Sequence, residues 1–112
     1  MNRLDQLLAR SRREIEAHTN DLINTETGRY FIDEAAHLLA ALRRWSQSLY
    51  RSNRVVQEVL EAGDVTVLRD VSAHLRGMGG REAKTAHATV ATMAMLPSAQ
   101  LQAIASYALR AL

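Results

Sequence analysis

The chain has 112 residues, a length typical of one domain, so we expect a single domain over residues 1–112. Hydrophobic residues make up 47% and charged residues 23%, a balance that excludes an intrinsically disordered chain. The net charge of +2 is too small to indicate nucleic-acid binding by itself, and the lack of cysteine excludes disulfides and thiolate metal sites. Aromatic residues amount to only 4%, which favours closely packed helices over β-sheets.

No run of residues approaches the roughly 20 consecutive apolar positions that a membrane-spanning helix needs. The first residues, Met1–Gln6, lack the apolar core of a signal peptide. We therefore expect a cytoplasmic protein that has no membrane partner.

The first expected helix covers about residues 3–24, with Asn2 as its N-cap. Its apolar stripe repeats at alternating steps of three and four residues, as in an amphipathic helix. Thr25–Gly28 is then predicted to form a turn in which Gly28 takes the left-handed conformation. The next helix would fold back antiparallel to the first. The stripe contains Leu4, Leu8, Ser11, Ile15, His18 and Leu22.

The second expected helix, from about Ile32 to about Leu60, carries the most regular pattern in the chain. Its apolar stripe keeps one heptad phase throughout, and additional apolar residues make the buried face wider than a two-stranded seam. A break near Ser52–Asn53 is the alternative, because both residues are good helix caps. We favour continuity because the phase of the stripe carries straight across them. The stripe consists of Ile32, Ala35, Leu39, Leu42, Ser46, Leu49, Asn53, Val56 and Leu60.

Three shorter helices are expected to follow. Gly63 ends the second helix with a left-handed cap, and the third helix stops at Gly77. A fourth helix covers residues 81 to about 95, and Pro97 or Ser98 opens the last one. The third helix starts at Asp64 or Thr66. The predicted fold class is all-α, a helical bundle built on a long antiparallel helical hairpin with three shorter C-terminal helices.

Motifs for catalysis are lacking in this sequence. It has no cysteine, no nucleophile elbow and no phosphate-binding loop ending in Gly-Lys-Ser/Thr, so we expect neither an enzyme nor a cofactor. A weak metal hypothesis joins Glu34 and His37, one turn apart, with Glu14 and His18 on the first helix. Di-metal bundles need two such helical pairs and further carboxylates. Glu34 and His37 also point away from the seam, so no metal is expected.

One charge feature lies within the second helix. Between Ala35 and Gln57 there is no acidic residue, while four arginines fall in this stretch. A basic outer face of this kind could contact DNA or RNA phosphates, or an acidic protein surface. The alternative is a solvated face whose arginine stems pack over apolar neighbours. The four are Arg43, Arg44, Arg51 and Arg54.

The second helix also predicts self-association. Ser46 and Asn53 are consecutive polar residues on its seam, and polar seam residues often fix the register and the number of subunits. A straight helix of about 29 residues is about 43 Å long, so it would project beyond a compact monomer. Either the C-terminal helices fold back over its far end or a second subunit covers it, and we favour a homodimer. The expected interface comprises Leu42, Trp45, Ser46, Leu49, Asn53, Val56 and Leu60.

The predicted function is that of a non-enzymatic, dimeric protein–protein interaction module, such as an adaptor, a chaperone-like protein or a regulator. The alternative is a small DNA-binding, transcription-regulating dimer that uses the basic face of the second helix.

Overall fold

Helices form wherever the sequence repeats an apolar stripe at steps of three and four residues. The computed structural model describes residues 2–19, 25–49 and 52–112, and within these ranges it contains helices and no strand. The predicted all-α bundle is confirmed. No helix in these ranges is long and apolar enough to cross a membrane. The helices are α1 (Arg3–Ala17), α2 (Glu26–Ser48), α3 (Asn53–Ala62), α4 (Val65–Gly77), α5 (Arg81–Met93) and α6 (Ser98–Leu109).

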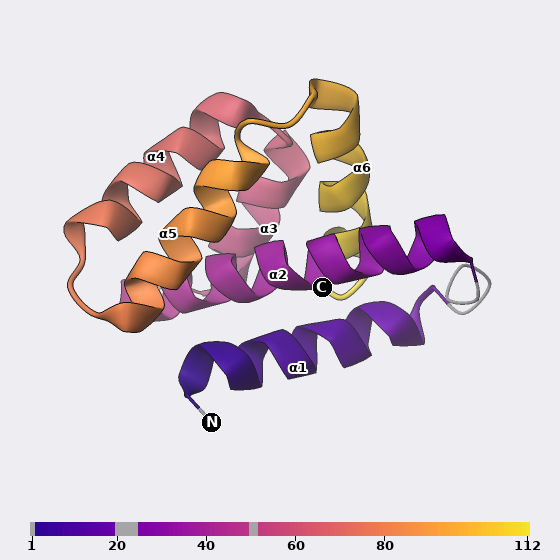
Figure 1. The fold of residues 1–112 in the computed structure, drawn as a ribbon, viewed down its shortest axis with the longest axis horizontal. Helices are drawn as coiled ribbons and strands as arrows, with labels where there is room; N and C mark the ends of the chain where they lie inside the picture. The colour runs from indigo at the N-terminus through magenta and orange to yellow at the C-terminus, as the bar shows by residue number, and fades with distance from the viewer. Residues whose placement is uncertain (1, 20–24, 50–51) are drawn as a thin grey trace.

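The centre of the bundle is α2. From Leu38 to Arg43 every residue of α2 is buried, so this part of the helix is enclosed on all sides. Figure 1 shows why: α1 lies along one side of α2, while α3, α4, α5 and α6 gather on the other. Buried alanines such as Ala36, Ala40 and Ala41 have small side chains, which allows the neighbouring helices to approach α2 closely. The wide apolar face predicted from the sequence is therefore buried against several helices.

The helices α1 and α2 lie side by side (Figure 1). Arg3 and Gln6 line the same hollow as Gln47, near the end of α2, whereas Arg12 is paired with Asp33, near its start. This order of contacts is compatible with the predicted antiparallel hairpin. The buried stripe of α1 is thin and consists of Leu7, Ser11 and Ile15.

The first helix is shorter than predicted. It ends at Ala17. The backbone N–H groups of His18 and Thr19 donate to carbonyls three residues earlier, those of Ile15 and Glu16, and the Thr19 hydroxyl also donates to the Ile15 carbonyl (2.8 Å). His18 is exposed, so it does not belong to the buried stripe. The remainder of the predicted helix, residues 20–24, lies outside the described residues.

The second helix is interrupted where continuity was predicted. α2 ends at Ser48 with Leu49 as its C-cap, and α3 begins at Asn53 after an extended Ser52 (ψ 167°). The prediction of a continuous helix from Ile32 to Leu60 is therefore wrong, and the alternative, a break near Ser52–Asn53, is confirmed. Four shorter helices follow α2 instead of three. Tyr50 and Arg51 lie outside the described residues.

Local hydrogen bonds give a physical reason for the break. The Ser46 hydroxyl donates to the Ser52 carbonyl (3.2 Å), and the Ser48 hydroxyl donates to the Trp45 carbonyl (2.6 Å). Serine side chains that bond to nearby backbone in this way compete with the regular helical ladder. The apolar stripe keeps its phase across the break because α2 and α3 bury their faces against the same core.

Apart from the end of α1 and the break after α2, the helix ends follow the local signals with one exception. Asn2 caps α1, Gly63 takes the left-handed conformation (φ 52°) and Asp64 caps α4, as predicted. The exception is Thr25–Gly28, which is not a separate turn. The Thr25 side chain accepts from the Gly28 N–H (2.9 Å), so it acts as the N-cap of α2, and Gly28 is a buried residue of that helix.

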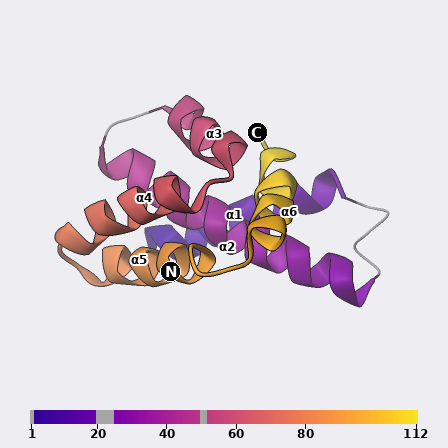
Figure 2. The same ribbon diagram turned by 90° about the horizontal axis from the view of Figure 1, so that it is seen from above.

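The described chain is compact, with a radius of gyration of 12.9 Å and extents of 39 × 31 × 23 Å. α4 and α5 pack side by side, and α6 crosses α2 steeply (Figure 1, Figure 2). Because α3 turns away from the axis of α2, the described chain contains no straight helix of about 29 residues. The helix-length argument for a dimer consequently no longer applies, and the homodimer stays a prediction.

Candidate functional site

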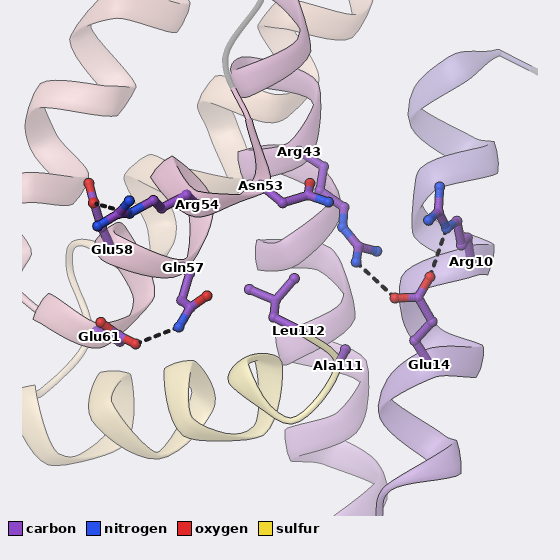
Figure 3. A pocket seen from close by; sticks show the side chains of 10 residues that line it. All are labelled: Arg10, Glu14, Arg43, Asn53, Arg54, Gln57, Glu58, Glu61, Ala111 and Leu112. Atoms are coloured by element: carbon purple, nitrogen blue, oxygen red, sulfur yellow. Dashed lines mark hydrogen bonds and ion pairs between the residues drawn. The ribbon is translucent and has the colours of Figure 1, made fainter.

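A charged cleft opens between α1, α3 and the last residues of the chain (Figure 3). Its volume is about 640 Å³, and Arg43 reaches it from α2. Six of its ten lining residues are arginine or glutamate. The lining residues are Arg10, Glu14, Arg43, Asn53, Arg54, Gln57, Glu58, Glu61, Ala111 and Leu112.

Arg43 is the anchor of this cleft. Its side chain is only 6% exposed, and its guanidinium donates to the Ser11 hydroxyl (2.9 Å) and to the Glu14 carboxylate (2.8 Å). Arg10 donates to the other Glu14 oxygen (2.7 Å). A guanidinium this deeply buried needs such partners, because an unpaired buried charge is strongly unfavourable. Arg43 thereby ties α2 to the middle of α1.

The electrostatics of Glu14 follow from these neighbours. Partial burial raises the pKa of the Glu14 carboxyl, but the hydrogen bonds and charges of Arg43 and Arg10 outweigh burial and hold the pKa below its ordinary value of 4.5. Glu14 is therefore ionised at neutral pH.

The other glutamates of the cleft also have hydrogen-bond or ion-pair partners. Arg54 lies 3.4 Å from Glu58, and Gln57 donates to Glu61 (2.8 Å), each along one turn of α3 (Figure 3). With three arginines and three glutamates lining it, the cleft has no formal excess of either charge. This arrangement suits a structural junction better than a site for a charged ligand.

The predicted basic face does not form one exposed surface. Arg43 is buried against α1, and Arg44 turns towards Glu82 of α5, 3.5 Å away. Arg54 is exposed on α3 beside Glu58, and Arg51 lies outside the described residues. No acidic residue lies between Ala35 and Gln57 in the sequence, but helices distant in sequence place glutamates beside these arginines in the fold.

The predicted dimer interface is likewise divided by the fold. Leu42, Ser46, Val56 and Leu60 are buried in the core of the chain itself, with at most 3% of their surface exposed. They are therefore not available to a partner while the chain stays folded, which corrects the prediction of one continuous seam. Asn53 is exposed in the charged cleft instead of setting a buried register.

Two residues of that interface, Trp45 and Leu49, remain partly exposed and line an apolar hollow between the end of α2, α3 and α4. The hollow has a volume of about 410 Å³. We call it the Trp45 groove. It is lined by Trp45, Leu49, Val59, Val67, Asp70, Val71 and His74.

Two features distinguish the Trp45 groove from ordinary surface. Trp45 is the only tryptophan of the chain, and its indole N–H is buried without a hydrogen-bond partner among the described residues. Asp70 and His74, both exposed on α4, form no hydrogen bond or ion pair within the part of the chain that the structure describes. The groove thus joins an apolar lining to three polar groups that lack partners.

The four residues of the metal hypothesis are not brought together. Glu14 is held by two arginines, His18 is exposed at the end of α1, and His37 Nδ1 lies 2.8 Å from the Asp33 carbonyl oxygen. Within residues 2–19, 25–49 and 52–112, no group of three or more histidine, aspartate or glutamate side chains is placed to hold a metal ion.

Comparison of the chain with protein families, curated proteins and solved structures gave no match. The Trp45 groove was not predicted from the sequence as a site, although Trp45 and Leu49 were selected as contact residues. The sequence signal for this groove was the place of Trp45 at the edge of the apolar face of its helix, together with Val67 beside the apolar stripe of α4. Trp45 and Val67 line one groove only because of the way α4 packs in the bundle, and a local sequence pattern does not specify that packing.

Proposed function

We propose that this chain is a non-enzymatic protein-binding module that receives a partner protein in the Trp45 groove. The observation that carries the proposal is the apolar groove itself, which contains the only tryptophan of the chain and its unpaired indole N–H. Tryptophan is enriched among the residues that dominate binding energy at protein interfaces.

The shape and composition of the groove support this proposal. Its walls come from three helices, so the apolar side chains are held by the bundle rather than by a free loop. Leaving a buried donor unpaired costs about 1–3 kcal/mol. A partner that lets the Trp45 indole turn towards an acceptor would therefore gain affinity from that rearrangement.

The phosphate-binding alternative finds less support. Affinity for nucleic acid comes from several cations that reach phosphates together. Of the four predicted arginines, Arg43 is buried in an ion pair, Arg44 faces Glu82, and Arg54 lies beside Glu58. We therefore centre the proposal on protein binding.

Affinity capture from nuclease-treated extract of the native host tests the proposal. Three baits are compared: the wild-type chain, Val67→Glu, which places a charge in the groove, and Thr85→Glu, which alters an exposed residue of α5 outside the groove. We expect at least one protein that wild type and Thr85→Glu retain and Val67→Glu loses. Identical captures by all three baits would overturn the proposal.

A folding control accompanies the capture. Far-UV circular dichroism and thermal melting must show that each bait remains helical at the temperature of the experiment. If Val67→Glu does not fold, Leu49→Ser replaces it, since Leu49 lines the same groove and lies at the end of α2. The same loss of capture is expected.

A further inference from the structure

We infer that the partner in the Trp45 groove is a second copy of this chain, with the two α4 helices antiparallel about a two-fold axis. The inference rests on the proposed function because it uses the same groove. Its basis is one face of α4. Val67, Asp70, His74 and Gly77 follow one another at steps of three, four and three residues, so they form one ridge along the edge of the groove.

A two-fold interface must be complementary to itself, because one surface meets its own copy. In an antiparallel pair of α4 helices, we place the axis between Asp70 and His74 on the ridge, at the level of residue 72 but on the face opposite the buried Ser72 side chain, so that positions symmetric about 72 face each other. Asp70 then faces His74 of the partner subunit, and Val67 faces Gly77 of the partner subunit. A large side chain meets a glycine whose Cβ position has open space around it.

The polar groups of this ridge are self-complementary. Asp70 offers a carboxylate acceptor and His74 an imidazole donor, and neither has a partner in the described chain. Two-fold symmetry forms the pair twice, so it fixes the register of the two helices. Arg69 and Arg76 lie on the opposite flank of α4 by their helical positions, and therefore do not oppose each other at the axis.

The apolar part of the groove supplies the driving force. Trp45, Leu49 and Val59 lie beside the ridge, so a second copy seated on the ridge also covers them and removes apolar surface from water. The inferred interface leaves Leu42, Ser46, Val56 and Leu60 in the core of each chain, unlike the seam predicted from the sequence.

Sedimentation velocity of the full chain, from low micromolar to near-millimolar concentration, tests the inference with a charge swap. Asp70→Arg removes the carboxylate that faces His74 of the partner subunit, and His74→Asp places two carboxylates across the axis, whereas the double variant places opposite charges there. We expect each single variant to raise the dimer dissociation constant at least about tenfold, because each lost pair or repulsion occurs twice. The double variant should return close to wild type, and Arg69→Glu, on the far flank, should leave the constant unchanged.

Two results would overturn the second copy as partner: a wild-type chain that stays monomeric at every concentration, or a double variant no tighter than the single ones. If a single variant fails to fold, Asp70→Asn and His74→Gln take its place, and both should weaken the dimer. A monomeric chain that still captures a groove-dependent protein leaves the proposed function standing. Loss of both dimer and groove-dependent capture removes both.

Discussion

Replacing Glu14 with alanine should destabilise the fold far more than removing an ordinary surface charge. The substitution leaves the Arg43 guanidinium, 6% exposed, with Ser11 as its remaining hydrogen-bond partner. Breaking a buried ion pair costs about 3–5 kcal/mol, and because Glu14 itself is 29% exposed we expect the lower end, about 3 kcal/mol. For a domain of this size that corresponds to a fall in Tm of about 12 °C.

Urea unfolding followed by circular dichroism measures the change in the free energy of unfolding. Glu58→Ala is the matched control, because its ion pair with Arg54 is exposed at both ends and should contribute less than about 0.5 kcal/mol. The double variant Glu14→Leu with Arg43→Met should recover most of the loss, since apolar residues can replace a buried ion pair at little cost. A Glu14→Ala protein as stable as the control would refute the anchoring role of Arg43.

Two further predictions concern pH and backbone conformation. Because the folded pKa of Glu14 lies below 4.5, its charge stabilises the fold fully above about pH 5, and this contribution is lost as the pH falls through the folded value. The stability difference between wild type and Glu14→Gln should therefore shrink in acid, and a difference independent of pH would contradict this sign. Gly63→Ala should cost about 1–2 kcal/mol, because Gly63 is left-handed (φ 52°), whereas Gly79→Ala, with open space and no such φ, should change stability by less than about 0.5 kcal/mol in the same urea assay.

Local signals in the sequence were sufficient for most helix ends. Asn2, Gly63 and Asp64 act through backbone atoms within a few residues of themselves, so their roles can be read without tertiary contacts. The break after Ser48 could not be read from the stripe. The phase of the apolar stripe depends only on which side of each helix faces the core. Because α2 and α3 face the same core, the stripe stays in phase whether or not the helix is interrupted.

The candidate site depended on contacts between distant segments. Arg43 was assigned to an exposed face because no acid is close to it in sequence, yet Glu14, twenty-nine positions earlier, lies 2.8 Å away. Trp45 and Leu49 were predicted as residues of a dimer seam, and most of the other residues of that seam are buried in the core of the chain itself. The groove arises only when Val67 and His74 of α4 approach them.

Site-specific photo-cross-linking in the native host tests most directly whether the Trp45 groove binds protein. A benzophenone amino acid is placed at Val67, in the groove, and at Thr85, on α5 outside it, and each chain is irradiated in cells. We predict covalent protein adducts from position 67 and none from position 85, with an adduct of twice the mass of the chain if the second copy is the partner. Equal adducts from both positions, or none from position 67, would contradict the groove as a docking site.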